Sequence, residues 1–262
     1  MNKTPLYGGA KILLFDIETM PIEALVWDMY ETNVIKIIKD WYMISFSYKW
    51  LGEKDTHVLA LPDYKDYTKD RSNDKKLVTD LWKLFEEADI IVGHNGDKFD
   101  IKKTNARFIK HNLPPLPEPK TVDTLKVAKK HFKFTSNKLN DLGEFLGLGQ
   151  KEKTGGIDLW LDCRANIPKA WKLMKKYNKQ DVVLLEAVYL KLSPWFKNHP
   201  NVNLHRNLPE QRNSCPACGS RRIQRRGFEL TSTTRYQRLQ CQDCGKWSRE
   251  RKSFKEEVPT VK

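Results

Sequence analysis

The sequence predicts an α/β fold in which a mixed β-sheet is flanked by helices, with a small second module near the C-terminus. Three short apolar or aromatic segments early in the chain have the composition of strands, and helical and strand patterns alternate after them. The last quarter of the chain differs from the rest because it holds four of the five cysteines. A length of 262 residues allows one to two domains with a well-buried core.

The net charge of the chain is +14, from 47 lysines and arginines against 33 acidic residues. Residues 194–262 hold 15 of these basic residues and only 6 of the acidic ones, so this segment carries most of the excess. Such a charge indicates a polyanionic partner, most simply nucleic acid, although a basic protein without that role has the same composition. Apolar runs are shorter than the ~18 residues of a spanning helix, and the N-terminus lacks the layout of a signal peptide. We therefore expect a cytoplasmic protein without a membrane partner.

The first part of the chain supplies three expected strands. Residues 11–15 (KILLF) are an apolar run bounded by glycines and acidic residues, which is typical of a buried strand. Residues 41–50 are rich in aromatic and alternating side chains, and residues 57–60 follow a turn, so both are expected to be strands. We expect residues 21–40 to form an insertion that is helical in part.

Helices and strands then alternate. Leucines at helical spacing, prolines and glycines predict where these elements begin and end. Helices are expected over 75–87, 97–111, 124–130, 139–146 and 168–192, and strands over 89–93 and 120–123. Residues 147–156 are polar, basic and rich in glycine, which predicts a mobile loop.

Two acidic residues stand at the end of the first expected strand. Asp16 and Glu18 are two residues apart, so they point to one face of the sheet and lie about 6.5 Å apart along the strand. Open α/β sheets bind ligands at the carboxyl ends of their strands, and paired carboxylates favour hard divalent cations such as Mg²⁺ or Mn²⁺. Such a pair also arises by chance on protein surfaces.

Two further polar groups occur later in the chain. The segment HNGDKFD (94–100) follows an expected strand and leads into a helix, so its acids could serve as helix caps. In the long helix, Tyr177 and Asp181 lie one turn apart and share a face. Strongly apolar turns follow Asp181, so we expect its carboxylate beside a buried face, where it needs a metal or a hydrogen-bond partner. A Tyr–Asp pair on the solvent face is the alternative.

The three motifs occur in the order Asp-x-Glu (16–18), Asn-x-x-x-Phe-Asp (95–100) and Tyr-x-x-x-Asp (177–181). This order resembles the DEDD, or DnaQ-like, superfamily of 3′–5′ exonucleases, whose fold is ribonuclease-H-like. The tyrosine is typical of the tyrosine subclass, and residues 11–192 look most like the exonuclease domain of family B DNA polymerases. Free-standing exonucleases of this kind are common in bacteriophage genomes, which implies the host cytoplasm as the location.

The resemblance implies an active site with two divalent cations, Mg²⁺ or Mn²⁺. It implies that Asp16, Glu18, Asp100 and Asp181 bind these cations and that Tyr177 orients the attacking water. Two such cations can activate water and stabilise the leaving 3′-oxygen of a cleaved phosphodiester.

The resemblance also implies contacts with the terminal nucleotide. It places Thr19, Met20, Asn95 and Phe99 at this nucleotide, and plain packing is an equal alternative for Met20 and Phe99. Asp123 resembles a supporting acid of the superfamily and ranks below the four metal-binding residues.

Four cysteines form two C-x2-C pairs separated by 22 residues, Cys215 with Cys218 and Cys241 with Cys244. This spacing predicts one structural Zn²⁺ bound by four thiolates in a zinc ribbon. A redox role is the alternative for such pairs, and disulfides are not expected without an export signal. The fifth cysteine, Cys163, is expected to be a core or surface thiol.

The ribbon is expected to contain a β-hairpin over 221–240 and to bind nucleic acid. Basic and aromatic side chains are interleaved in it, which suits phosphate contacts and base stacking. The side chains assigned to substrate binding are Arg225, Arg226, Arg235, Arg238 and Trp247. A solvated basic surface on a ribbon that binds another protein is the alternative.

These observations predict an exonuclease domain at 1–193, a linker at 194–213, a zinc ribbon at 214–252 and a tail at 253–262. The predicted activity is metal-dependent removal of nucleotides from DNA 3′ ends. Expected partners are single-stranded DNA or DNA 3′ ends, with a replication protein as a further candidate. A 3′–5′ exoribonuclease, a branched-structure nuclease and a non-catalytic DNA-binding or replication adaptor are the alternatives.

Overall fold

The computed structural model of the chain describes residues 8–205 and 214–253. These residues divide into two compact units, and the first runs from Lys11 to Tyr189. The second contains residues from Leu190 onward together with residues preceding Lys11. Each unit has its own sheet and its own buried cluster.

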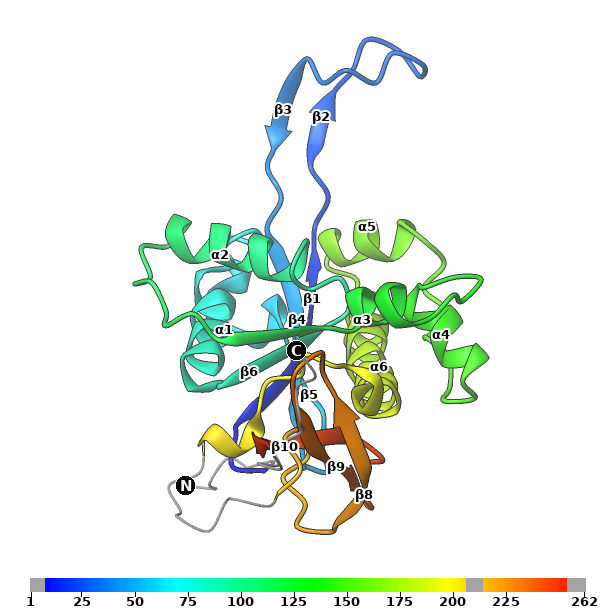
Figure 1. Cartoon of the computed structure of the whole chain (residues 1–262). Coiled ribbons are helices and arrows are strands. Elements are labelled where there is room, and N and C mark those ends of the chain that lie inside the picture. The colour runs from blue at the N-terminus through cyan, green and yellow to red at the C-terminus, as the bar shows by residue number, and fades with distance from the viewer. Residues whose placement is uncertain (1–7, 206–213, 254–262) are drawn as a thin grey trace. The chain divides into compact units, whose positions relative to one another are not determined.

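The first unit is built on a five-stranded sheet with the strand order β5-β4-β1-β6-β7 (Figure 1). Its strands are β1 (Ile12–Thr19), β4 (Met43–Trp50), β5 (His57–Ala60), β6 (Ile90–Gly93) and β7 (Lys120–Asp123). β4 pairs antiparallel with β1 and β5, whereas β6 is parallel to β1 and β7. The mixed sheet predicted from the sequence is therefore confirmed.

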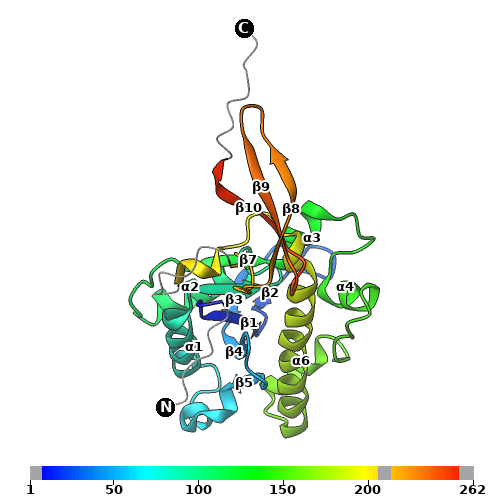
Figure 2. The ribbon, with the colours of Figure 1, turned by 60° about the horizontal axis from the view of Figure 1, so that its bottom comes forward.

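Helices cover both faces of this sheet. Their bounds are α1 (Lys75–Glu87), α2 (Asp100–Lys110), α3 (Thr124–His131), α4 (Leu139–Phe145), α5 (Asp158–Arg164) and α6 (Pro168–Leu192). Figures 1 and 2 show α1 and α2 on one side of the strands and α3 to α6 on the other. Two 3-10 helices, Leu61–Asp63 and Lys65–Thr68, precede α1. The predicted helices all occur, whereas α5 was not predicted.

The alternation of side chains along β1 explains how one strand serves both the core and a polar site. The ring of Phe15 packs edge-on against Phe85 of α1, with centroids 4.9 Å apart. The next residue, Asp16, points to the other face and hydrogen-bonds to Asn178 of α6. The first face is therefore an apolar core, and the second presents carboxylates toward α6.

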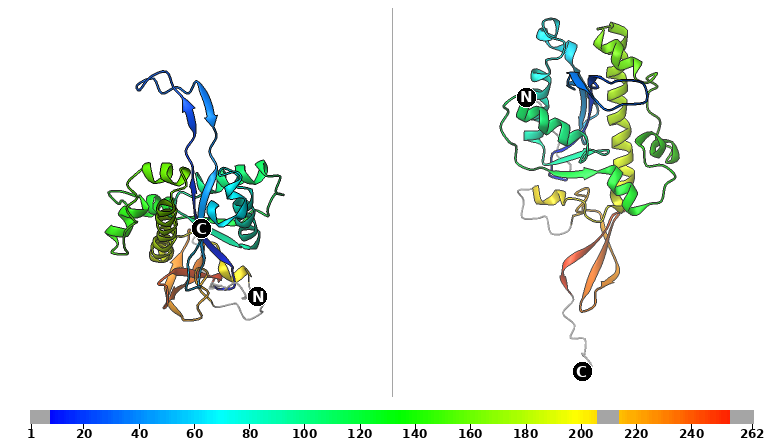
Figure 3. Two further views of the ribbon diagram at one scale, coloured as in Figure 1. Left: turned by 180° about the vertical axis from the view of Figure 1, so that it is seen from behind. Right: turned by 90° about the horizontal axis from the view of Figure 1, so that it is seen from above.

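Residues 21–40 form a two-stranded arm, so the prediction of partial helix was wrong. β2 (Glu23–Leu25) and β3 (Lys36–Lys39) pair antiparallel, and the arm extends away from the sheet and helices of the first unit (Figures 1 and 3). An amphipathic helix needs one apolar face, but the adjacent residues Ile37 and Ile38 are exposed to similar extents, 51% and 52%. β-branched residues favour the strand, and pairing within the hairpin satisfies its backbone.

The second unit contains an antiparallel sheet with the order β10-β9-β8. Its strands are β8 (Ile223–Leu230), β9 (Arg235–Cys241) and β10 (Trp247–Ser253). The predicted hairpin corresponds to β8 and β9, and β10 is a third strand that the sequence did not reveal.

The described part of the predicted linker packs on this unit. It includes two 3-10 helices, Ser193–Trp195 and Val202–His205. The buried Val202 donates its backbone N–H to the carbonyl of Pro216 at 2.9 Å. The remainder of the predicted linker (206–213) and nearly all of the predicted tail (254–262) lie outside the described residues.

Among the residues that the structure describes, no helix combines the length and the apolar character needed to cross a membrane.

Candidate active site and metal centres

Asp16 and Glu18 lie on the part of β1 that extends beyond β6. The pairing of β6 with β1 ends at Leu14, whereas β4 accompanies β1 as far as Thr19. Asp16 and Glu18 therefore stand at the carboxyl end of the central strand, where the parallel neighbour has already ended. This is the edge at which open α/β sheets bind ligands.

Asp100 reaches the same edge from the first turn of α2. Its Oδ1 accepts a hydrogen bond from the backbone N–H of Ile17 at 3.4 Å, and the side chain is buried. The other acid of this loop, Asp97, instead pairs with Lys126 at 2.6 Å. The residues alone gave either acid as a helix cap, whereas the resemblance assigned Asp100 to the site, and the fold brings Asp100 to β1.

Asp181 and Tyr177 approach β1 from α6. Carboxylate oxygens of Asp16, Glu18 and Asp181 all lie within 4.8 Å of one another. Asp181 is 1% exposed, and its Oδ1 is a buried atom with no hydrogen-bond partner among the described residues. The charge of Asp181 helps burial to raise the pKa of Tyr177, and the Tyr177 ring lies 6.1 Å from that of Trp160 on α5. The solvent-face alternative for this pair is therefore excluded.

Asn178 is a site residue that the sequence analysis missed. Its Nδ2 donates to Oδ2 of Asp16 at 2.7 Å, and its Oδ1 accepts from the hydroxyl of Ser45 at 3.0 Å. Its backbone carbonyl also accepts from Ser47 at 2.5 Å. This fully buried amide thus fixes the carboxylate of Asp16 relative to α6 and β4. Its spacing of three residues from Asp181 on one helix was the available signal.

Lys151 is the second residue that the sequence analysis missed. Its Nζ lies 2.5 Å from Oδ2 of Asp181 and 5.4 Å from the centre of the Tyr177 ring. Its backbone N–H donates to Oδ1 of Asn140 at 2.8 Å, which holds the start of the loop. The only sequence signal was the basic character of the loop at 147–156. This loop contains no helix or strand in the structure.

Burial and mutual repulsion raise the pKa values of these carboxyl groups. Burial, followed by the charge of Asp181, raises the pKa of Glu18 to about 8, and burial raises that of Asp100 to about 7. Burial and the charges of Asp100 and Glu18 raise the pKa of Asp16 well above its usual range. Burial lowers the pKa of Lys151, but the nearby carboxylates, Asp181 first, outweigh it and raise that pKa overall. The site therefore favours positive charge.

The residues present fit divalent cations. The donors are carboxylate oxygens alone, which suit Mg²⁺ and Mn²⁺ rather than softer metals. The unpartnered Oδ1 of Asp181 is a buried acceptor for which a cation would be a partner. Asp100 adds a further negative charge beside Asp16.

The four residues predicted to contact a terminal nucleotide have different surroundings. Thr19 Oγ1 accepts a 3.4 Å hydrogen bond from Lys103, whose Nζ also lies 5.1 Å from the centre of the Phe99 ring. Phe99 is 41% exposed, so its ring is available to a ligand. Met20 is 2% exposed and belongs to the core cluster, which supports its packing alternative.

Asp123 supports the loop that carries Asn95. Its Oδ1 accepts hydrogen bonds from the backbone N–H groups of Leu125 and Lys126, so it caps α3. The same oxygen accepts from the N–H of Asn95 at 3.0 Å. Asn95 has a left-handed backbone with φ of 65°. Asp123 thus helps to fix the conformation of the loop between β6 and α2.

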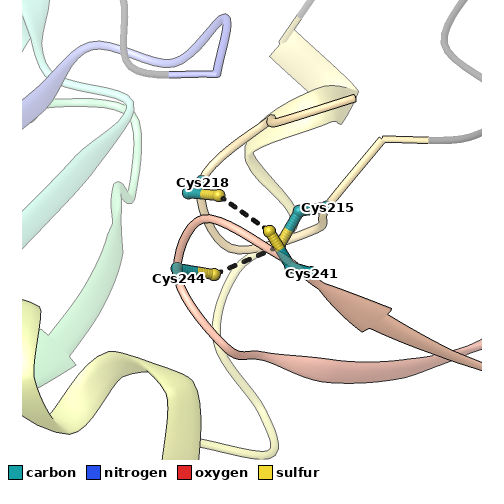
Figure 4. A group of neighbouring side chains, drawn as sticks. All are labelled: Cys215, Cys218, Cys241 and Cys244. Carbon is teal, nitrogen blue, oxygen red and sulfur yellow. Dashed lines mark hydrogen bonds between the residues drawn. The ribbon is translucent and has the colours of Figure 1, made fainter. Parts of the chain in front are cut away.

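The cysteines of the second unit form one group (Figure 4). Cys215 Sγ lies 3.5 Å from Cys244 Sγ, and Cys218 Sγ lies 3.7 Å from Cys241 Sγ. All four sulfur atoms lie within 4.8 Å of one another, as tetrahedral thiolate coordination of zinc requires. Cys163 is a buried thiol of the first unit, and burial raises its pKa to about 12.

The two C-x2-C pairs have the same local structure. In each, the backbone N–H of the first cysteine donates five residues ahead, to Ser220 or Lys246, at 2.8 and 2.9 Å. Gly219 and Gly245 close the turns with φ values of 73° and 77°, in the left-handed region that glycine tolerates. Two matched turns therefore present the sulfur atoms to one point.

Comparison with known proteins identifies the family. Residues 13–193 match the family model of the RNase_H superfamily. The chain belongs to the RNase_H superfamily. The match includes Asp16, Glu18, Asp100, Tyr177 and Asp181 and ends before the cysteine group.

Parts of this RNase_H superfamily chain are similar to DNA polymerases. The DNA polymerase III PolC-type of Pediococcus pentosaceus is 28% identical over 130 residues, and that of Ureaplasma parvum is 30% identical over 136 residues. These alignments cover 48% and 50% of this chain but 9% of each polymerase. The family B DNA polymerase from the hyperthermophilic archaeon Pyrobaculum calidifontis superposes with a TM-score of 0.51 and 17% identity. That superposition covers 71% of this chain and 25% of the polymerase, and it shows a shared fold.

Proposed function

We propose that the chain is a metal-dependent 3′–5′ exodeoxyribonuclease that acts on DNA 3′ ends by two-metal hydrolysis. One observation carries the proposal: carboxylates from β1, α2 and α6 converge at the carboxyl end of the central strand. Three of them have oxygens within 4.8 Å of one another, and the fourth, Asp100, is bound to the backbone between Asp16 and Glu18. Such a set favours cation-dependent chemistry on a phosphodiester.

Asp16, Glu18 and Asp181 would hold the cations, with Asp100 adding the fourth carboxylate. The bound cations would supply Lewis-acid stabilisation of the pentacovalent phosphorus and of the leaving 3′-oxygen. Asn178 keeps Asp16 in place through its 2.7 Å hydrogen bond, so the carboxylate is oriented before a ligand arrives.

Tyr177 would orient the attacking water. Burial and the charges of Asp181 and Glu18 raise its pKa above the ordinary value, so it keeps its proton at neutral pH. A neutral phenol can position water by hydrogen bonding but does not act as a general base. The ammonium of Lys151 lies within the same cluster and would attract a phosphate oxygen.

The preference for DNA rests on the relatives, which are named as DNA polymerases. We assign the cysteine group to one structural Zn²⁺ and the basic ribbon to nucleic-acid binding. The experiment must distinguish this exodeoxyribonuclease from two alternative hypotheses, an exoribonuclease and a non-catalytic adaptor. We also propose that the chain comes from a bacteriophage and acts in the cytoplasm.

The test is cleavage of 5′-labelled single-stranded DNA with Mg²⁺ or Mn²⁺. We expect a ladder that shortens from the 3′ end, and we expect Asp16→Ala to reduce the rate by at least about 10³-fold because a metal-binding carboxylate is lost. Asp162→Ala removes an exposed carboxylate outside the site and serves as the matched control. A 5′-labelled RNA of the same sequence tests the exoribonuclease reading.

Each outcome has a definite consequence. Equal activity of the Asp16→Ala variant and the wild type would contradict the assignment of these carboxylates as the active site. Faster cleavage of RNA than of DNA would show that the enzyme is an exoribonuclease. Binding without cleavage under either metal would favour the adaptor.

A further inference from the structure

The sheet of the second unit has two faces that differ in chemistry. Directly opposed residues of an antiparallel pair share a face, and Arg238 lies opposite Arg249 while Gln240 lies opposite Trp247. Tyr236 lies two residues before Arg238 on β9 and therefore shares that face. On β8, Gln224 lies opposite Gln240, so Arg226, two residues after Gln224, lies on the same face. We name it the stacked-arginine face, and its basic and aromatic residues are Arg226, Tyr236, Arg238, Trp247 and Arg249. Glu229, which lies opposite Tyr236, shares this face and pairs with Arg249 at 2.9 Å.

Two cation–π contacts cross between β9 and β10 on this face. The guanidinium carbon of Arg238 lies 4.7 Å from the centre of the Trp247 ring. The guanidinium carbon of Arg249 lies 4.2 Å from the centre of the Tyr236 ring. Each strand thus contributes one ring and one guanidinium group, and Trp247 is still 43% exposed. The result is an array of two aromatic rings and their stacked guanidinium groups, in which Arg238 has no acidic partner among the ion pairs of the described residues and Arg249 pairs with Glu229.

A bulge in β8 holds Arg238 in this array. The strand pairing shifts register between Arg225 and Phe228, and Gly227 in between has φ of 64°. This left-handed backbone is readily adopted only by glycine among common residues. At the bulge the carbonyl of Arg226 accepts a 2.9 Å hydrogen bond from Nε of Arg238. The backbone therefore fixes the plane of one guanidinium group before any ligand binds.

The opposite face has a similar number of charges but a different arrangement. Arg225 pairs with Glu250 at 3.0 Å. Arg235 lies over the ring of Phe228, with the guanidinium carbon 3.7 Å from the ring centre. Leu230, which is 73% exposed, adjoins that stack. Each face therefore has one ion-paired arginine, but this face has one arginine–aromatic stack where the other has two, and it adds exposed apolar surface.

We propose that the stacked-arginine face is the single-stranded nucleic-acid binding surface of the ribbon and that the opposite face is not. The inference rests on the nucleic-acid role given to the ribbon in the proposed function. It divides the arginines assigned from the sequence: Arg226 and Arg238 belong to the binding face and Arg225 and Arg235 do not. It also adds two residues, Tyr236 and Arg249.

Stacking distinguishes a single strand from a duplex. Unpaired bases expose their π faces and stack on aromatic rings and guanidinium planes. Paired bases are already stacked, so a duplex would use only the charges of the surface. A surface that alternates rings with arginines therefore binds an unpaired strand better than a charge-matched duplex.

The experiment measures binding of the full-length chain to fluorescein-labelled dT20 by anisotropy. An Asp16→Ala background without added Mg²⁺ or Mn²⁺ prevents cleavage. We expect Arg238→Ala with Arg249→Ala to weaken binding about 10-fold or more. An unlabelled 20-base-pair duplex should compete at least about 10-fold less well than dT20.

The opposite face provides a matched control. Arg225→Ala with Arg235→Ala also removes two arginines, one in an ion pair and one on an aromatic ring, and should weaken binding about 3-fold or less through general charge. Trp247→Leu and Phe228→Leu form a second matched pair, and only the first should weaken binding markedly. Replacing Arg238 with Lys keeps the charge and the fold but loses the planar group, so it should lie between the wild type and Arg238→Ala.

Equal losses from the two double variants would overturn the face assignment. Equal competition by duplex and dT20 would overturn the preference for a single strand, and absence of dT20 binding by the parent chain would overturn the site altogether. Cleavage is followed separately with Asp16 intact. A chain that binds as expected but never cleaves would contradict the proposed exonuclease and leave this inference standing.

Discussion

The carboxylate site of the first unit and the cysteine site of the second differ in how they relate to stability. The carboxylates come from β1, α2 and α6, and burial raises the pKa of each one. Two buried acids (Asp100 and Asp181) and two half-buried ones (Asp16 and Glu18) that repel one another oppose folding unless a cation or proton is present. The cysteines come from two short, matched turns, and the small buried cluster around them contains few other side chains.

The two units obtain their stability from different sources. The first unit has a large apolar core that can tolerate an unfavourable polar site. The second has a small sheet with exposed strands, so we expect it to depend on the metal that we propose for the cysteines. A metal at the first site would serve chemistry, and a metal at the second would serve folding.

The largest expected effect is loss of the second unit when the cysteine site is broken. Cys218→Ser should abolish binding of one Zn²⁺ per chain and unfold β8 to β10, because structural zinc contributes roughly 10–16 kcal/mol in small modules. Zinc content by mass spectrometry and protease resistance of the unit measure this. Cys163→Ala is the control, because that buried thiol lies in the first unit and should leave zinc content unchanged. Retention of zinc by Cys218→Ser would contradict the four-thiolate site.

The next effect concerns pH. Without added Mg²⁺ or Mn²⁺, the first unit should lose stability as pH rises from about 4.5 to about 8. Glu18 has a pKa of about 8 when folded against 4.5 for the free group, and Asp100 has about 7 against 3.8. The folded state therefore binds more protons in this window, and deprotonation favours unfolding.

Thermal unfolding midpoints at pH 5 and pH 8 measure this effect. Mn²⁺ should raise the midpoint more at pH 8 than at pH 5, because cations bind the ionised carboxylates. Glu18→Gln should reduce the pH dependence, whereas the exposed Asp162→Asn should not. A midpoint that rises from pH 5 to pH 8 without added metal would contradict the assigned pKa directions.

A smaller effect is expected at Lys151. Lys151→Met should destabilise the first unit by about 1–3 kcal/mol when no divalent cation is added, because the buried Asp181 loses its charged partner. The same change should tighten Mn²⁺ binding, since the ammonium group no longer competes for the carboxylates. Urea unfolding and calorimetric titration with Mn²⁺ provide the two measurements.

Lys153→Met is the matched control, because this exposed lysine belongs to the same loop. Weaker Mn²⁺ binding by Lys151→Met would show that the lysine supports the cation site instead of competing with it.

The smallest effect is expected in the arm. Leu25 pairs with Lys36, so replacing residues 26–35 with Asn-Gly would join the two strands through a short turn. The removed segment includes Trp27, Met29 and Tyr30, which are 76%, 85% and 93% exposed. The free energy of unfolding of the first unit should change by about 0.5 kcal/mol or less. A larger loss in urea unfolding would show that the arm contributes to the stability of the unit.

Local patterns in the sequence accounted for most of the fold. Apolar runs and helical spacing predicted the five strands of the main sheet and five of its six helices. The arm was mispredicted because its apolar residues stabilise no core, so the usual link between periodicity and burial fails there. The short α5 and the third ribbon strand carry too little periodic signal to be recognised without their packing partners.

The order of the acidic motifs and the spacing of the cysteines are properties of the amino-acid sequence alone. The cysteine group follows from local geometry, because each pair lies in one turn whose conformation depends on neighbouring residues. The contacts of Asn178 with Asp16, 162 residues away in the chain, and of Lys151 with Asp181 form only in the tertiary structure. Contacts of this kind depend on how helices and loops pack across a sheet, and no local pattern encodes that packing.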